Sequence, residues 1–250
     1  MAERHQRIVE LLKESGSMRV RELAELLCVT QETIRRDLDK LEEEGRIVRS
    51  HGGAVAPEVT QGETPYFQRE VINAAEKKRI ARAALAFVRE HDRIVLDASS
   101  TAWYLSAILP NMPLTVLTNS VKVALELAGK EKITVISTGG TLAPTSLSYV
   151  GPLAQRGLEH YHADKVFISC KGVHLQRGIS ESNELQAMVK QQMINIADQV
   201  YLLADHTKLG VQALTYVAPL NDVDRLITDR APEAEWLEQL DRLQVGLVQA

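Results

Sequence analysis

Six short apolar runs alternate with segments of helical periodicity through the larger, C-terminal part of the chain. The runs lack the alternation of apolar and polar residues that a strand with one solvent-exposed face has. The segments between them carry apolar residues at helical spacing. A mostly parallel sheet covered by helices on both faces explains both features, so we expect an α/β domain. The runs occupy residues 94–97, 114–118, 133–137, 166–169, 200–204 and 225–228, and the clearest helical segments occupy residues 102–109, 121–128 and 184–197.

The residues that follow these runs are rich in hydroxyl groups, glycine and lysine. Ligands of open α/β sheets bind at the carboxyl ends of the strands, and helix N-termini with unpaired amides attract anions. Taken singly, such residues are explained more simply as helix caps and turns. Three such junctions and two lysines on one sheet edge favour a site for a small phosphorylated ligand. The predicted effector-binding residues are Asp97, Ser99, Ser100, Thr101, Asn119, Ser120, Gly139, Gly140, Lys171 and Lys208.

The N-terminal segment has the pattern of a helix-turn-helix followed by a basic hairpin. Apolar spacing predicts one helix over residues 4–14 and a second over residues 20–27. The Thr30 hydroxyl can cap a third helix, whose apolar residues fall on one face at about 100° per residue. Residues 46–53 then have the composition of a two-stranded wing. This combination predicts a winged helix-turn-helix, which points to transcription regulation.

The polar face of the third helix and the wing carry the residues expected to contact DNA. Arg35 and Arg36 lie in the half that would enter the major groove, where a bidentate contact to guanine is worth about 1–3 kcal/mol. Their simpler role is phosphate contact or pairing with Glu32 and Asp39. Asp37 is expected to tie the helix to a neighbouring element. The predicted DNA-binding residues are Gln31, Thr33, Arg35, Arg36, Lys40, Arg46, Arg49 and His51.

The charge of the chain argues against DNA binding driven by bulk electrostatics. Its formal net charge is −4, and residues 1–56 carry ten Lys or Arg residues against eleven Asp or Glu residues. A domain that is slightly acidic does not attract nucleic acid by its overall field. Recognition must therefore depend on where individual arginines are placed.

A proline-containing segment without apolar periodicity separates the two parts of the chain. Residues 57–65, PEVTQGETP, are interpreted as a linker between a DNA-binding domain over residues 1–56 and an effector-sensing domain over residues 66–250. Residues 66–91 are expected to form one long helical stretch that begins the second domain. Because winged helix-turn-helix proteins read paired half-sites, we expect a homo-oligomer.

Several other classes of protein are not indicated. No apolar run approaches the roughly 18 residues of a membrane helix, and the N-terminus is too polar for a secretory signal, so a cytoplasmic protein without a membrane partner is expected. Cys28 and Cys170 are expected to be buried free thiols. His160 and His162 have no supporting cluster, so neither a metal nor a cofactor is assigned.

Six motifs, from both parts of the chain, resemble those of a known family. Six segments are similar, in the same order, to those of the DeoR family of bacterial sugar-catabolism regulators. They are RHQRIVELL (4–12), TIRRDLDKLEEEGRIVRSHGG (33–53), LDASSTAWYL (96–105), TNS (118–120), STGGTL (137–142) and ADHTKLG (204–210). The resemblance implies a winged helix-turn-helix joined to a sensor domain similar to ribose-5-phosphate isomerase. It also implies a sugar phosphate as effector, and a repressor is the expected sign of regulation.

One departure from the family pattern narrows the expected effector. Many members have glycine at the position of Ser99, whereas D97-ASSTAWYL-L105 resembles the branch that regulates L-fucose use, a version that rhamnose regulators are expected to share. This implies a 6-deoxy-ketose 1-phosphate, such as fuculose or rhamnulose 1-phosphate. Trp103 and Tyr104 could pack near the deoxy-sugar methyl group, although aromatic residues on a helix more often belong to the core.

The resemblance to an isomerase leaves an enzyme as the alternative. A sugar-phosphate isomerase needs a carboxylate that moves a proton between adjacent carbons. The comparable strand end here is Ser169-Cys170-Lys171-Gly172, without the acidic residues of the isomerase. Glu181 and Glu184 remain as other carboxylates, which a loop and a helix start explain more simply. We expect no catalysis; the alternative is a sugar-phosphate isomerase-like enzyme with an accessory DNA-binding domain.

Overall fold

The computed structural model describes residues 2–15, 17–44, 46–50, 53–55 and 63–250. The chain divides into two compact units, Met1–Gly62 and Glu63–Ala250, each of which is described by itself. The sequence-predicted linker, residues 57–65, spans this division, and its first six residues lie outside the described ones.

The N-terminal unit is a helix-turn-helix with a small sheet. Its core is formed by buried side chains from all three helices together with Ile47 and Ala54. The Thr30 side chain accepts a hydrogen bond from the Thr33 amide and so caps the third helix, as predicted. The elements are α1 (Ala2–Ser15), β1 (Ser17–Arg19), α2 (Val20–Leu26), α3 (Gln31–Glu43), β2 (Val48–Ser50) and β3 (Gly53–Val55).

The sheet of this unit has one strand more than the sequence indicated. β3 pairs antiparallel with β2, as expected for the wing, and also with β1. The close approach of β1 explains the glycine at position 53, because a Cβ atom there would collide with the carbonyl oxygen of Met18. A strand of three residues has too little alternation to be recognised from sequence. Cys28, expected to be buried, is exposed, in a left-handed turn (φ 52°) before α3.

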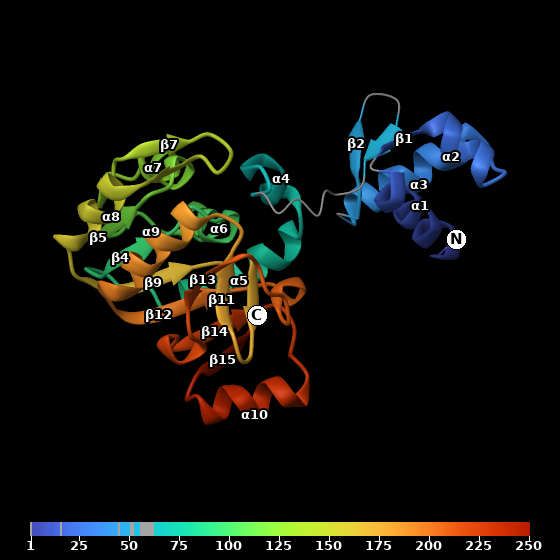
Figure 1. The fold of residues 1–250 in the computed structure, drawn as a ribbon. Helices are drawn as coiled ribbons and strands as arrows, with labels where there is room; N and C mark the ends of the chain where they lie inside the picture. The colour runs from blue at the N-terminus through green and yellow to red at the C-terminus, as the bar shows by residue number, and fades with distance from the viewer. Residues whose placement is uncertain (1, 16, 45, 51–52, 56–62) are drawn as a thin grey trace. The chain divides into compact units, whose positions relative to one another are not determined.

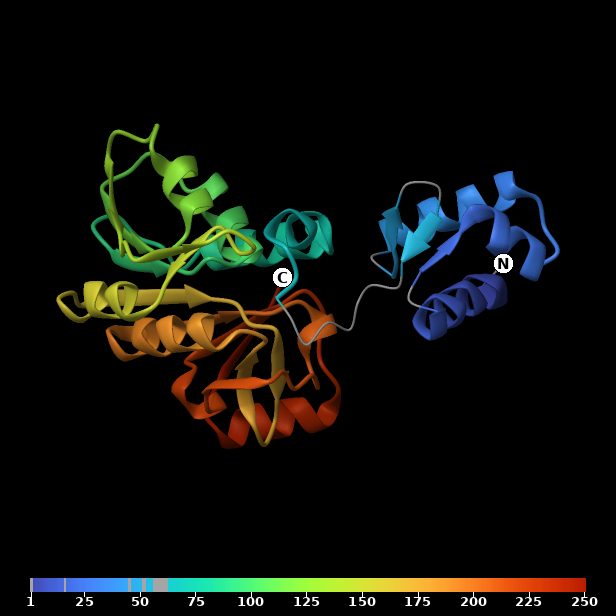
Figure 2. The same ribbon diagram turned by 45° about the horizontal axis from the view of Figure 1, so that its top comes forward.

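The sensor unit is built on a seven-stranded parallel sheet in the order β15-β14-β12-β9-β4-β5-β6 (Figures 1 and 2). All six predicted strands are present, and the seventh, β15, lies at one edge. The predicted α/β class is therefore confirmed. The strands are β4 (Arg93–Leu96), β5 (Leu114–Thr118), β6 (Ile133–Ser137), β9 (Ala163–Ile168), β12 (Ala197–Leu203), β14 (Arg225–Thr228) and β15 (Gly246–Gln249).

Two apolar cores cover the two faces of this sheet. Along β4, Ile94 and Leu96 belong to the core that contains α5, α6 and α7, whereas Val95 belongs to the core that contains α8, α9 and α10. This explains why the strands are continuously apolar. The helices are α5 (Ala74–Leu85), α6 (Ser100–Ile108), α7 (Val121–Leu127), α8 (Pro152–Glu159), α9 (Glu184–Asn195) and α10 (Ala234–Arg242), with short 3-10 turns η1 (His206–Lys208) and η2 (Leu220–Asp222).

Two antiparallel additions were not indicated by the sequence. One is a two-stranded ribbon, β7 with β8, and the other is a three-stranded sheet in the order β10-β11-β13. Their strands are three or four residues long, so they carry little periodic signal. The strands are β7 (Thr141–Ala143), β8 (Ser148–Val150), β10 (Gly172–His174), β11 (Gly178–Glu181) and β13 (Thr215–Ala218).

The expectation of one long helix over residues 66–91 is wrong. The segment forms α4 (Tyr66–Val71) and α5, with a break at Ile72 and Asn73 between them. Asn73 has a left-handed backbone (φ 52°), which cannot continue a right-handed helix and which asparagine tolerates better than most residues. Its side-chain amide donates to Asp205 at 3.2 Å. A long-range contact therefore fixes a break that local periodicity cannot show.

No helix within the described residues is long and apolar enough to span a bilayer.

Candidate DNA-binding and effector sites

The polar face of α3 presents two arginines to solvent. The side chains of Arg35 and Arg36 are 52% and 78% exposed, and both lie near the carboxylate of Glu32, at 3.5 Å and 3.6 Å. These distances are those of loose surface ion pairs, which contribute little to stability. Both guanidinium groups can therefore exchange Glu32 for another partner. Gln31 and Lys40 are also exposed on this helix, and the Thr33 hydroxyl is hydrogen-bonded to that of Thr30 at 2.9 Å.

The two wing arginines are less exposed, at 35% for Arg46 and 29% for Arg49. Arg46 donates to Gln6 at 2.8 Å and lies 3.3 Å from Glu44. Arg49 lies 3.7 Å from Asp39 of α3. These contacts link the wing to the helices, so Arg46 and Arg49 have structural roles beside any contact with DNA. His51 lies outside the described residues.

A buried carboxylate joins the first helix to α3. Asp37 accepts hydrogen bonds from Arg4 Nε at 2.6 Å and from His5 Nε2 at 3.0 Å. Burial by itself would raise the pKa of Asp37, but hydrogen bonds from these two residues outweigh it and hold that pKa below its usual value. Asp37 therefore ties α3 to α1, as the sequence suggested, and orients the exposed face of α3.

At the carboxyl edge of the large sheet, Asp97 forms the centre of a buried polar network. It is fully buried and accepts hydrogen bonds from Ser99 and from the Ser169 amide at 3.0 Å. The ammonium group of Lys190 lies 2.6 Å away and also lies 2.8 Å from Glu181. Asp97 thus fixes the loop after β4 against the loop after β9.

The hydroxyl groups after β4 and β5 divide into two kinds. Ser99 and Ser120 cap α6 and α7, each accepting a hydrogen bond from the amide three residues later. Ser100 instead donates to the carbonyl oxygen of Arg69 at 3.1 Å. Thr101 Oγ1 and Asn119 Oδ1 are buried without a hydrogen-bond partner. Helix capping therefore explains Ser99 and Ser120. Thr101 and Asn119 each keep a buried oxygen that can still form a hydrogen bond.

The remaining predicted effector residues lie at the ends of the next strands. Gly139 and Gly140 follow β6 with positive φ angles of 63° and 110°. The ammonium group of Lys208 donates to Ser169 Oγ at 2.7 Å and lies 4.0 Å from Asp205, which places it beside the Asp97 network. Lys171 is exposed and lies immediately before β10.

Other charged residues at this edge were missed by the sequence analysis. Lys77 of α5 is buried and donates to the carbonyl oxygens of Arg69 and Ile72, the latter at 2.6 Å. Burial, assisted by the nearby charge of Lys208, lowers the pKa of Lys77 to about 7. Lys190 is a second charged residue that the sequence analysis missed. Its burial could have been inferred, because it lies three residues before the buried Met193 and therefore on the apolar side of α9.

Glu63 and Arg69 extend the charged cluster toward α4. Burial raises the pKa of Glu63 above its usual value, even though Arg69, at 3.9 Å, acts in the opposite direction. Arg69 Nε and Nη2 are buried without a hydrogen-bond partner, and its guanidinium lies 5.5 Å from the centre of the Tyr66 ring. Unpartnered donors on a residue whose backbone carbonyl binds Ser100 are an arrangement that an anionic ligand would complete.

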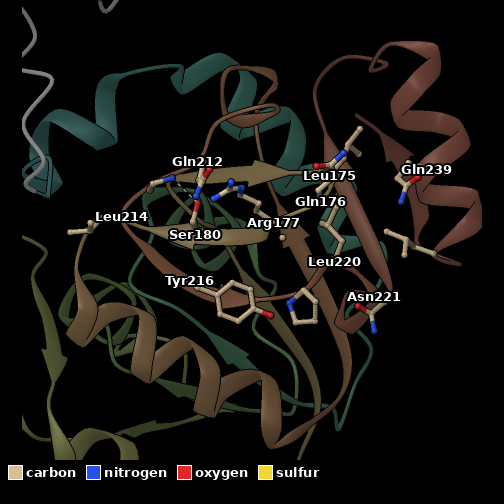
Figure 3. Close-up of a pocket in the computed structure, with 14 residues that line it drawn as sticks. Leu175, Gln176, Arg177, Ser180, Gln212, Leu214, Tyr216, Leu220, Asn221 and Gln239 are labelled. Atoms are coloured by element: carbon tan, nitrogen blue, oxygen red, sulfur yellow. Dashed lines mark hydrogen bonds between the residues drawn. The ribbon is translucent and has the colours of Figure 1, made fainter.

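A cavity of about 580 Å³ lies elsewhere in the sensor unit, between the β10-β11-β13 sheet and α10 (Figure 3). Arg177, Ser180, Tyr216 and Gln239 are among its lining residues, and none of the strand-end residues is. Buried polar atoms without a hydrogen-bond partner lie outside this cavity, among them Arg69 Nε, Thr101 Oγ1 and Asn119 Oδ1. Within the described part of the chain, no group of three His, Cys, Asp or Glu side chains is placed to hold a metal ion.

Comparison with known families decides the identity. Residues 4–60 match the DeoR-like helix-turn-helix domain, and residues 72–230 match the DeoR C terminal sensor domain. The chain belongs to the DeoR family. The resemblance drawn from the motifs is therefore confirmed, and with it a role in transcription regulation through DNA binding.

Relatives within the DeoR family match nearly the whole chain. The HTH-type transcriptional regulator YulB of Bacillus subtilis is 50% identical over 245 residues, which covers 98% of this chain and 95% of that protein. The HTH-type transcriptional repressor GlcR of the same organism is 38% identical, over 96% and 93% of the two chains. The L-fucose operon activator of Escherichia coli is 37% identical, over 91% and 95%.

Solved structures similar to this DeoR-family chain are more distant. Ribose 5-phosphate isomerase A from Methanocaldococcus jannaschii has a TM-score of 0.41 and 17% identity, over 55% of each chain. The sorbitol operon regulator SorC from Klebsiella pneumoniae has a TM-score of 0.37 and 10% identity, over 82% of this chain and 89% of its own.

Proposed function

We propose that this protein is a repressor of a sugar-catabolic operon, whose affinity for operator DNA is controlled by a phosphorylated sugar bound at the carboxyl edge of the sensor sheet. The observation that carries the proposal is the group of buried polar atoms without partners at that edge, on Arg69, Thr101 and Asn119, in a chain whose N-terminal unit is a DeoR-like helix-turn-helix. Such atoms favour a ligand with several hydrogen-bonding groups.

The phosphate is assigned to the hydroxyl and amide groups after β4, β5 and β6. The proposed phosphate ligands are Ser100, Thr101, Asn119, Gly139 and Gly140, with Lys171 and Lys208 as sources of positive charge. Asp97, Ser99 and Ser120 would hold the loops and helix starts of the site in place. Asp97 acts on the loop rather than on the sugar, since its carboxylate is already occupied by Ser99, Ser169 and Lys190.

For the sugar itself we propose a 6-deoxy-ketose 1-phosphate, such as fuculose or rhamnulose 1-phosphate. Support comes from the D97-ASSTAWYL-L105 motif and from the L-fucose operon activators among the relatives. Trp103 and Tyr104 give no additional support. Their polar atoms bind Glu126 and the Glu70 carbonyl, at 3.1 Å and 3.0 Å, and their rings pack on the core.

DNA binding is assigned to the N-terminal half of α3 and to the wing. Arg35 and Arg36 would read bases, while Gln31, Thr33, Lys40, Arg46, Arg49 and His51 would contact the backbone or flanking bases. A single recognition helix reads one half-site, so the active form is a homo-oligomer. A regulator of this kind works where the operon lies, in the cytoplasm.

The enzymatic alternative is less well supported by the chemistry of the strand ends. Lys190 neutralises both Asp97 and Glu181, so neither carboxylate is free to move a proton between carbons. Burial raises the pKa of the Cys170 thiol to about 12, which leaves it un-ionised and a poor nucleophile. We propose a binding protein without catalytic activity.

The decisive experiment is an operator titration with and without sugar phosphates. The full chain is used to select its operator from random DNA, and binding is then followed by fluorescence anisotropy with fuculose 1-phosphate, rhamnulose 1-phosphate, fructose 1-phosphate and glucose 6-phosphate. We expect at least one of them to weaken operator binding, and the unphosphorylated sugars to have no effect. No response to any phosphate would overturn the effector class, and turnover of one of them would favour the enzyme.

A further inference from the structure

The first helix of the sensor unit lies against the proposed effector site. α4 starts at Tyr66, three residues after the division between the two units at Gly62 and Glu63. Its peptide chain is therefore the direct continuation of the segment that leads from the DNA-binding unit. Any change in the position of α4 would therefore also move residues 63–65, which lead into it.

The C-terminal carbonyl groups of α4 are held by side chains of the effector site and its surroundings. Ser100 donates to the Arg69 carbonyl at 3.1 Å, and Lys77 donates to the same oxygen. Tyr104 donates to the Glu70 carbonyl at 3.0 Å. Just beyond α4, Asn73 donates to the Asp205 carboxylate. The seating of α4 thus depends on Ser100, a residue assigned to the effector phosphate.

The side chains of α4 that face inward have unused hydrogen-bonding groups. Arg69 Nε and Nη2 and the Tyr66 hydroxyl are buried without a hydrogen-bond partner. Tyr66 is 1% exposed. Arg69 has one ion pair, with Glu63 at 3.9 Å, which is too long for a hydrogen bond. The Arg69 side chain is 25% exposed, but its Nε and Nη2 are shielded from solvent and make no hydrogen bond, so an anion that accepts from them would be favoured.

We propose that α4 is a ligand-responsive strap: Arg69 and Tyr66 bind the phosphate of the effector together with Ser100, and this binding changes the seating of α4. The inference rests on the proposed function, since it names the residues and the element through which the same site acts. Arginine suits this role because its planar fork matches phosphate oxygens.

Effector binding and the position of α4 are coupled because the Ser100 hydroxyl can donate to only one acceptor at a time. The Ser100 hydroxyl has one proton, which the Arg69 carbonyl accepts in the structure. When that proton turns to a phosphate oxygen, the carbonyl loses one of its two donors while the Arg69 side chain gains a partner. Effector binding therefore favours a different arrangement of α4, and only such a difference between two states can shift DNA affinity.

The test combines calorimetric binding with hydrogen exchange on the full-length protein. The probes are L-fuculose 1-phosphate and inorganic phosphate, and exchange is compared between residues 66–73 and the α9 segment, residues 184–195. The variants are Arg69→Gln and Tyr66→Phe, with Arg82→Gln as the control, because Arg82 is an exposed arginine on α5. Operator affinity without probe and thermal unfolding establish that each variant is folded.

We expect a probe to bind the wild type and the Arg82→Gln variant and to change exchange in residues 66–73 but not in α9. Arg69→Gln should weaken probe binding by about tenfold or more, because hydrogen bonds to charged groups are lost. Tyr66→Phe, which removes only an unpartnered hydroxyl, should fold normally and weaken binding by about two- to tenfold. Operator affinity without probe should stay at the wild-type value in Arg82→Gln, because Arg82 lies outside the proposed site.

Three other outcomes would overturn the inference in distinguishable ways. Equal probe affinity of wild type and Arg69→Gln would remove α4 from the site and leave the proposed function standing. Weaker binding by Arg69→Gln with unchanged exchange in residues 66–73 of the wild type would leave Arg69 as a ligand and remove the strap. Failure of the wild type to bind either probe would remove both the strap and the proposed effector site.

Discussion

The ammonium group of Lys190 lies 2.6 Å from the carboxylate of Asp97, and both side chains are almost completely buried. Burial by itself would lower the pKa of Lys190, but the charges of Asp97 and Glu181 outweigh it and raise that pKa above its usual value. Lys190 therefore remains a cation. It links α9 to the loops after β4 and β9, at the point where the effector is proposed to bind.

Replacing Lys190 by methionine should destabilise the protein strongly. The change leaves Asp97 and Glu181 as buried carboxylates without a counter-charge, and breaking a buried ion pair in this way costs about 3–5 kcal/mol. Urea unfolding followed by circular dichroism measures the effect. Lys132→Met is the control, since Lys132 is exposed and should tolerate the change. If the two variants were equally stable, the pair would contribute nothing to the fold.

Replacing Arg36 by alanine should weaken operator binding without affecting the fold. Loss of a bidentate base contact costs about 1–3 kcal/mol, or about 5- to 150-fold in affinity. Arg242→Ala is a closely matched control, because Arg242 is 72% exposed and pairs with Glu238 four residues away, as Arg36 does with Glu32. Fluorescence anisotropy with operator DNA gives the comparison. Equal affinities of the two variants would exclude Arg36 from the interface.

Lys77 should make the stability of the protein depend on pH. Its pKa is about 7 in the folded protein against a usual value of 10.5, so between these values the unfolded chain holds a proton that the folded protein has lost. The free energy of unfolding should therefore rise with pH across this window, by at most about 1.4 kcal/mol per pH unit from this residue. Below pH 7 the dependence of stability on pH that comes from Lys77 disappears, because the residue is protonated in both the folded and the unfolded state.

Urea midpoints at pH 7 and pH 9 for the wild type and for Lys77→Met check this expectation. The variant should have a smaller increase between the two pH values than the wild type. Lys78→Met, at the exposed neighbouring position, should behave as the wild type does. Parallel curves for wild type and Lys77→Met would mean that Lys77 is charged in the folded protein.

The sequence predicted the parts of the fold that periodicity determines. Continuous apolar strands such as β4 signal a sheet covered on both faces, and the spacing in α3 distinguishes its core face from its polar face. Short strands such as β1 have no period to detect. The break at Asn73 depends on a contact with Asp205, 132 residues away in the chain, which no local pattern contains.

The candidate site could be located from the sequence, but its members could be sorted only in three dimensions. Hydroxyl groups after parallel strands gather at one edge whatever their detailed roles. Whether Ser99 caps a helix or binds a ligand depends on where its oxygen points. Arg69 and Lys77 belong to a segment whose residue spacing is that of an ordinary amphipathic helix. Their positions in the sequence therefore do not distinguish them from charged residues on the surface.

Two adjacent serines allow these roles to be separated experimentally. Ser99 and Ser100 are equally buried, but Ser99 caps α6 and donates to Asp97 at 2.5 Å, whereas Ser100 binds the carbonyl of Arg69. Ser99→Ala should therefore lower the free energy of unfolding by about 1–2 kcal/mol, the usual cost of a lost N-cap. It leaves the phosphate ligands in place.

Ser100→Ala should have the opposite profile. We expect an effector affinity about two- to tenfold weaker, because one hydrogen bond to the phosphate is lost. Urea unfolding and titration of the operator complex with fuculose 1-phosphate measure the two quantities on both variants. A wild-type effector response from Ser100→Ala would remove that hydroxyl from the site, and wild-type stability of Ser99→Ala would mean that the cap at α6 contributes nothing.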